Sequence, residues 1–283
     1  MKKVIALVAF VCLGFSLMAQ KHQNSLLWKV EGKNLKEASY LFGTVHMICA
    51  DSFYMPEKVK KAIEKTKQSY LEINMASPDF AKEAQLHMKG EKTISSQISN
   101  TESTYIDSIL KQKVGIPLTK VDSIKPLILM SMMMQQDFKC PIVSFEQEIV
   151  NLTHKKNQQV YGLSSVQEQY SFMDRIVSAK DFAAVLASME AYNIQDMIKD
   201  VYEYYKKEDV VGLNKMMEVF NTTNPDAYHY LLTIRNNLWV DRLPEIMQKD
   251  ATFIAVGSAH LSGDTGMIKL LQAKGYKVTP VFK

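Results

Sequence analysis

The sequence predicts an α/β protein with a mixed, largely parallel central sheet built from two pseudo-symmetric βαβ halves. Two segments that lie far apart in the chain carry this prediction. Residues 39–46 read SYLFGTVH, and residues 252–260 read TFIAVGSAH. Each is an apolar run, rich in β-branched and aromatic residues, that ends in Gly-x-x-His, a pattern typical of a buried strand.

The residues after each Gly-x-x-His repeat the same order of elements. In the first half, an amphipathic helix is expected from Pro56, followed by a strand over 69–73. In the second half, an apolar helix over 267–271 closes at Gly275 and precedes a strand over 276–282. Because parallel strands bind ligands at their carboxyl ends, we expect both histidines to face one crevice.

The middle of the chain reads mostly as helices. Apolar residues at helical spacing predict helices over 93–113, from the Lys125-Pro126 pair through Met134, and over 181–205 and 210–220. We expect a helical insert over about 80–245 that covers the sheet or forms a lid. No Pro/Gly-rich linker divides residues 20–283, which are therefore expected to form a single domain.

The first residues, MKKVIALVAFVCLGFSLMAQ, predict a secretory signal peptide over 1–19. The expected location is therefore periplasmic or secreted. The apolar run is too short for a stable membrane span, so none is expected after the signal is removed. Removing Lys2 and Lys3 lowers the formal net charge from +4 to +2. This small charge does not suggest nucleic acid as a partner.

Two cysteines follow the predicted signal, Cys49 and Cys140. In an oxidising compartment we expect a disulfide between them. It would tie the loop after the first Gly-x-x-His to the turn at Cys140-Pro141. The alternatives are two unpaired thiols, or Cys49 as a soft metal ligand three residues after His46.

A carboxylate accompanies the two histidines in this pattern. Glu72 lies within the apolar strand predicted over 69–73, where burial is costly unless a metal or cation pairs with it. His46, His260 and Glu72 together could form the ligand set of a divalent metal with open positions. Gly43 and Gly257 would let the backbone turn sharply and let a ligand approach closely. Alternatively, Glu72 faces solvent and both histidines are core residues.

Arg235 and Asn236 lie in a helical segment just ahead of the second Gly-x-x-His strand. An Arg on the apolar face of a helix needs an acidic partner, which could be Glu72, Glu146 or a peptide carboxylate. The alternative is a surface Arg whose aliphatic stem covers the sheet.

An ordered series of short motifs spans nearly the whole chain after the predicted signal, and it resembles the TraB/GumN family. The motifs, in order, are GTVH, Leu71-Glu72-Ile73, Lys125-Pro126, Ser144-Phe145-Glu146, Tyr161-Gly162-Leu163 with Glu168-Gln169, Arg235-Asn236 and VGSAHLSGDTG.

The resemblance implies a distant relation to the Tiki secreted metalloproteases, and a looser one to erythromycin-esterase-like and ChaN-like proteins. These share an α/β fold with pseudo-symmetric halves. In Tiki proteins, two Gly-x-x-His motifs and a Glu are tied to a divalent metal, typically manganese or cobalt. For this chain the resemblance therefore implies manganese or cobalt, with zinc as the alternative. Carried over, the resemblance implies metal ligands at His46, His260 and Glu72, and catalytic roles for Glu72, Arg235 and Asn236.

The chain departs from the family pattern at one position. Family members usually carry Gly-Leu-Glu where this chain has Gly162-Leu163-Ser164. The expected function is an exported, metal-dependent hydrolase that acts on peptides or proteins, with Arg235 and Asn236 orienting substrate or stabilising an oxyanion. One alternative, which Ser164 favours, is a protein that sequesters a peptide without cutting it. Another is a haem- or iron-binding protein.

Overall fold

The structure is a computed structural model that describes residues 24–191 and 194–282. The predicted signal peptide at 1–19 lies outside the described residues. No helix among the residues described is both long and apolar enough to cross a membrane.

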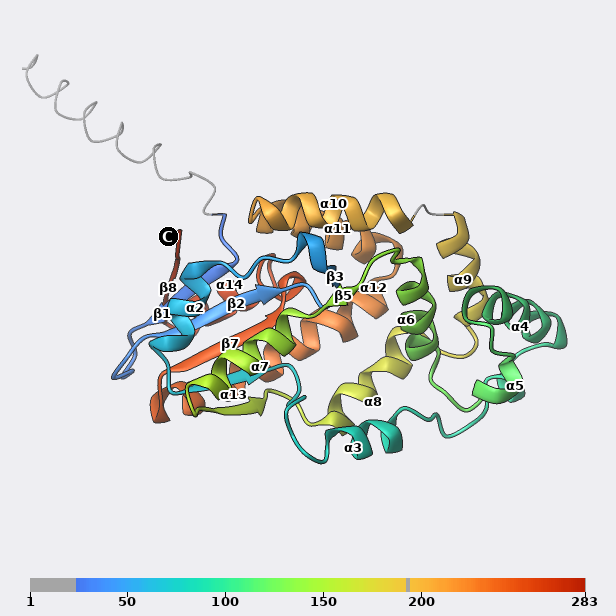
Figure 1. The fold of residues 1–283 in the computed structure, drawn as a ribbon, viewed down its shortest axis with the longest axis horizontal. Coiled ribbons are helices and arrows are strands. Elements are labelled where there is room, and N and C mark those ends of the chain that lie inside the picture. Colours follow the sequence, from blue (N-terminus) through green and yellow to red (C-terminus); the bar gives the residue numbers. More distant parts are fainter. Residues whose placement is uncertain (1–23, 192–193, 283) are drawn as a thin grey trace, which may run out of the picture.

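Six strands form the central sheet. They are β1 (Leu27–Glu31), β2 (Ser39–Thr44), β4 (Gln68–Leu71), β6 (Gln159–Gly162), β7 (Thr252–Gly257) and β8 (Lys277–Pro280). Their order across the sheet is β6-β4-β7-β2-β1-β8 (Figure 1). The strands β6, β4, β7 and β2 pair in parallel, whereas β1 pairs antiparallel with both β2 and β8. The α/β class and the largely parallel sheet are therefore confirmed.

The two predicted βαβ units interlock within this sheet. The first runs from β2 through α2 (Glu57–Glu64) to β4, and the second from β7 through α14 (Met267–Ala273) to β8. The strands β2 and β7 are neighbours at the centre, and β4 lies beyond β7. On the other side β1 separates β2 from β8, which breaks the symmetry between the halves.

All four predicted strands end earlier than the sequence indicated. The two Gly-x-x-His strands stop at Thr44 and Gly257 instead of at their histidines. The strands predicted over 69–73 and 276–282 stop at Leu71 and Pro280. His46 and Glu72 consequently follow their strands.

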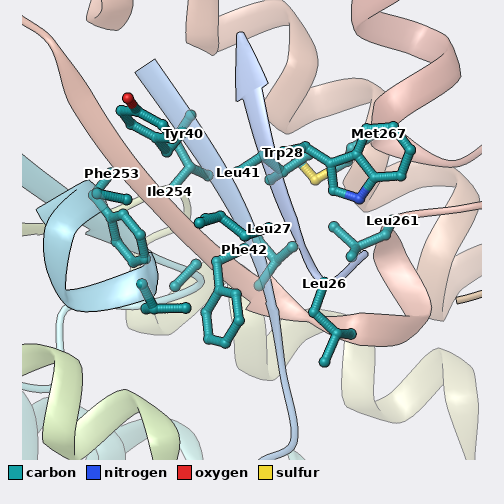
Figure 2. Close-up of a cluster of buried hydrophobic side chains, with 14 of the residues drawn as sticks. Leu26, Leu27, Trp28, Tyr40, Leu41, Phe42, Phe253, Ile254, Leu261 and Met267 are labelled. Carbon is teal, nitrogen blue, oxygen red and sulfur yellow. The ribbon is translucent and has the colours of Figure 1, made fainter. Parts of the chain in front are cut away.

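Apolar side chains from the central strands fill both sides of the sheet. Phe42 and Phe253 point to one side of the strands, whereas Trp28 points to the other (Figure 2). All three are buried, as is Met267 of α14. Phe42 also packs against Phe145, with ring centroids 6.1 Å apart. Alternation of side chains along a strand explains why one segment serves two core layers.

The middle region is mainly helical, as expected. Its helices are α3 (Phe80–His87), α4 (Asn100–Val114), α5 (Leu118–Val121), α6 (Pro126–Asp137), α7 (Phe145–Lys155), α8 (Val166–Ile176), α9 (Phe182–Ala191), α10 (Ile194–Lys206), α11 (Val210–Thr223), α12 (Pro225–Tyr228) and α13 (Ile234–Lys249). Two strands inside it were not predicted, β5 (Ile142–Val143) and β6. The strand β6 is only four residues long and forms one edge of the sheet.

The middle helices divide into two groups. The helices α7 and α2 lie on one face of the sheet, with α13 and α14 on the other (Figure 1). The helices α4, α5, α6 and α9 instead pack around a second hydrophobic cluster that includes Ile106, Leu129 and Phe182. The insert therefore covers the sheet only in part, and its remainder forms a helical lobe beside the sheet.

A disulfide joins Cys49 to Cys140, as predicted, across 91 positions. Next to it, β3 (Ile48–Cys49) pairs antiparallel with β5. The bond fixes the loop that follows His46 to the segment that leads into α7.

Removing this disulfide should destabilise the fold. The bond joins cysteines that are 91 positions apart. Disulfides that close such loops typically contribute about 2–4 kcal/mol to the free energy of unfolding, because they restrict the unfolded chain. We expect Cys49→Ser/Cys140→Ser to lower the free energy of unfolding in urea by that amount. A reducing agent should destabilise the natural protein equally and leave the double variant unchanged. Equal stability of the two proteins in oxidising buffer would contradict this.

Candidate functional site

The residues predicted to form one site meet at the carboxyl ends of three neighbouring parallel strands. His46 follows β2, Glu72 follows β4, and His260 ends a short turn, η4 (Ser258–His260), directly after β7. Because β4, β7 and β2 are adjacent and parallel, their carboxyl ends lie side by side. Residues separated by about two hundred positions are thereby brought together.

Both histidines face the same oxygen of Glu72. The Nε2 atom of His46 lies 3.8 Å from Oε1 of Glu72, and Nε2 of His260 lies 3.7 Å from it. The backbone N–H of Gly257 donates a 2.8 Å hydrogen bond to this same oxygen. Glu72 is thus the point on which both Gly-x-x-His motifs converge.

Arg235 holds the other oxygen of Glu72. Its guanidinium forms a buried ion pair with Oε2 and also donates to Oε1 of Gln169 at 2.9 Å. Burial alone would raise the pKa of Glu72. The charge of Arg235, with that of protonated His46 and the hydrogen bond from the Gly257 N–H, holds that pKa well below its usual range. Glu72 is consequently ionised at neutral pH.

His260 is buried and neutral. Its Nδ1 lies 2.6 Å from Oδ1 of Asn236, whose Nδ2 donates to the carbonyl of Thr265 at 2.8 Å. This second bond orients the amide, so Nδ1–H of His260 is the donor and Nε2 keeps its lone pair. Burial lowers the pKa of His260 to about 3, and the charge of Arg235 adds to this effect. The ring also packs on Trp239, with centroids 4.7 Å apart.

His46 is the accessible member of the site, with 61% of its side chain exposed. Its Nδ1 lies 2.8 Å from Oε1 of Glu146, which also accepts from Thr44 and Ser144. Desolvation lowers the pKa of His46, but the hydrogen bond to Glu146 and the charges of Glu72 and Glu146 raise it to about 9. Without a metal, His46 and Glu146 therefore form a charged pair at neutral pH.

The motif glycines allow close approach. A Cβ on Gly257 would lie 3.3 Å from both Oε1 of Glu72 and Nε2 of His46. A Cβ on Gly43 would lie 2.6 Å from Leu261, in the chain just after His260. Neither glycine has a positive φ. The sharp turn expected at these glycines is therefore not their role, whereas the expected close approach is present.

The donor chemistry of this cluster fits a divalent cation. Each imidazole has its Nδ1 committed to an oxygen and turns Nε2 toward a carboxylate, the arrangement that orients histidine ligands in metal sites. Among residues 24–191 and 194–282, however, no group of three His, Cys, Asp or Glu side chains lies close enough together, as the structure has them, to hold a metal ion.

Contrary to the expectation from sequence, Asn236 is not placed to contact substrate. It is 1% exposed, and its amide is fully used by His260 and Thr265. It therefore orients the His260 ring and does not reach toward substrate. Arg235 is 3% exposed, so its contact is with Glu72, the first of the acidic partners considered for it.

The position of Arg235 depends on an irregular helix. A π-helical segment, η3 (His229–Thr233), directly precedes α13. Such wider turns shift the residues after them and occur often at functional sites. Arg235 and Asn236, although consecutive, both reach the site from this helix start.

Two site residues were not assigned their roles from sequence. Glu146 was considered as a partner of Arg235, but it binds His46. Gln169 appeared only within the Glu168-Gln169 motif, yet it contacts both Arg235 and Glu72, the latter at 3.4 Å. Glu168 instead pairs with Arg242.

Ser164, the departure from the family pattern, lies behind the site. Its side chain is buried, and its hydroxyl accepts a 2.9 Å hydrogen bond from the indole N–H of Trp239. Trp239 in turn packs on His260 and beneath Arg235, whose guanidinium carbon lies 4.5 Å from the ring centroid. Position 164 therefore contacts the histidine and arginine through Trp239.

Comparison with known families shows to which family the chain belongs. The model of the TraB/PrgY/gumN family matches residues 26–280, nearly the entire described chain. The chain belongs to the TraB/PrgY/gumN family. The match includes His46, Glu72, Arg235, Asn236 and His260. No curated protein and no solved structure matched the chain.

In the metal-free protein, the pKa of His46 should lie above the ordinary value for histidine and the pKa of His260 below it. We expect a pKa near 9 for His46 and a ring of His260 that stays neutral down to about pH 4. The ordinary pKa is about 6.5. The His46 pair therefore stabilises the fold fully below that value, and its contribution is lost as pH rises through about 9. NMR titration of ¹³C-labelled histidine in EDTA measures both values.

Glu146→Gln provides the control for this titration. It should lower the pKa of His46, because it removes a charge and a charge-assisted hydrogen bond, and it should leave His260 unchanged. Titration of both rings near 6.5 would contradict the geometry described here.

Proposed function

We propose that this protein is an exported, metal-dependent hydrolase of the peptidase type. The observation that carries the proposal is the convergence of two imidazole Nε2 atoms on one oxygen of Glu72, with both Nδ1 atoms held by oxygen acceptors. His46, His260 and Glu72 would hold the ion, with manganese or cobalt as the first choice. The pattern of residues 1–19 supports export to the periplasm or beyond.

The chain's own residues would prepare this site in distinct ways. Asn236 keeps Nε2 of His260 unprotonated, and Glu146 orients the ring of His46. Arg235 keeps Glu72 ionised and fixes its rotation. A divalent ion bound there would polarise a peptide carbonyl and lower the pKa of a water molecule. The exposed side of His46 leaves room for a substrate to approach.

A second candidate function is peptide binding without cleavage. Glu72 is already neutralised by Arg235, so the cluster is electrostatically satisfied without an added cation. In addition, Ser164 stands where family members usually carry a carboxylate. Tight peptide binding without turnover in the assay below would favour this function.

Cleavage of a peptide library should require both the metal and His46. We expect turnover with manganese or cobalt, loss of turnover with chelator, and at least a hundredfold loss of kcat/KM in His46→Ala, since about 2.7 kcal/mol of transition-state stabilisation corresponds to that factor. His46 is mostly exposed, so its replacement should leave the fold intact.

His154→Ala is the matched control, because His154 is an exposed histidine on α7 with no contact to the site. It should cleave like the natural protein. Absence of metal-dependent cleavage, or full activity in His46→Ala, would overturn the proposed hydrolase.

Metal affinity should increase with pH. His46 is protonated below about pH 9 in the metal-free protein, and the ion must displace that proton. We therefore expect the apparent Kd for manganese to fall about tenfold per pH unit between pH 6.5 and 8.5. A competition titration with a chromogenic chelator measures this slope. In Glu146→Gln, where the pKa of His46 is lower, the slope should flatten within this range. A pH-independent Kd would exclude His46 as a ligand.

A further inference from the structure

A second concave region lies in the helical lobe, apart from the candidate metal site. It is a cavity of about 710 Å³ between the end of α3, the segment 89–97, the start of α6 and one face of α8. None of His46, Glu72, Arg235 and His260 lines it. Its volume lies within the range of small-molecule sites, about 300–1,000 Å³.

The wall of this cavity carries cations without anionic partners. Lys89 and Lys92 line it, and neither forms an ion pair with a described residue. Arg175 also lines it and lies over the ring of Tyr230. The lining contains two acids. One of them, Asp174, is bound by the buried Lys125, so Glu91 alone faces the three remaining cations. The cavity therefore has an excess of positive charge.

Part of the lining is apolar. Ile94 and Pro126 are buried, and Leu86 at the rim is 70% exposed, one of the large apolar side chains most open to solvent. Tyr170 adds an aromatic face with a hydroxyl group. An exposed leucine beside a concave, partly apolar wall is typical of a surface that binds an apolar group.

We propose that this cavity binds an organic carboxylate with an apolar tail. The carboxylate would pair with Lys89 and Lys92, and the tail would contact Leu86, Ile94 and Tyr170. A peptide's C-terminal apolar residue and a fatty acid share this chemistry. The cavity and the candidate metal site also share α8, because Gln169 contacts Arg235 while its neighbour Tyr170 faces the cavity.

Calorimetric titration with matched probes tests the proposal independently of catalysis. Octanoate and N-acetylphenylalanine carry the required charge and apolar tail, and they distinguish the lipid source from the peptide source. Octanamide and N-acetylphenylalaninamide lack only the charge, and inorganic phosphate lacks the tail. We expect saturable 1:1 binding of at least one carboxylate, with its amide and phosphate each at least tenfold weaker.

Variants locate the binding. Lys89→Glu/Lys92→Glu should weaken carboxylate binding at least tenfold, because it removes two exposed ion pairs and places two like charges beside the carboxylate. Leu86→Ser should weaken it as well. The matched control is Lys82→Glu/Lys120→Glu, which reverses two exposed lysines outside the lining and should have no effect. The proposal fails if no carboxylate binds, if the amides bind equally, or if the control pair weakens binding as much.

Discussion

The buried ion pair between Glu72 and Arg235 is the constraint on which the site depends. Both side chains are almost completely shielded from solvent. Removing one partner of such a pair leaves an uncompensated buried charge, at a cost of about 3–5 kcal/mol. The pair therefore fixes the end of β4 relative to the start of α13. Since Arg235 occupies one carboxylate oxygen and Gly257 N–H the other, Glu72 is fixed in the orientation that faces both imidazoles.

The supporting contacts differ on the two sides of this pair. On the His260 side they are buried and neutral, and they come from α13 and the turn after β7. On the His46 side they are charged and partly open, and they come from a segment tied by the Cys49–Cys140 disulfide. The His260 side of the site is thus held by packing, and the His46 side is held by a covalent link and an ion pair. The cluster is open to solvent on the His46 side.

Local pattern predicted the strands β2, β4, β7 and β8 and the residues that follow the first three, since short apolar runs and Gly-x-x-His are properties of short segments. The insertion of β1 between β2 and β8 could not be predicted, because a βαβ pattern does not say how many strands its crossover passes. The role of Glu146 was missed for a related reason. Its hydrogen bond to His46 spans a hundred positions and has no local spacing to reveal it. Arg235 was assigned more successfully, because an arginine on an apolar helix face requires an acid nearby.

Charge balance explains how the cluster can be stable as the structure shows it. Glu72 and Glu146 contribute two negative charges, while Arg235 and protonated His46 contribute two positive ones. The metal-free cluster is therefore neutral, which suits its burial. A divalent ion that displaces the His46 proton changes the net charge by only one unit. The accessible histidine, and not the buried one, is consequently the residue through which the cluster adjusts its charge.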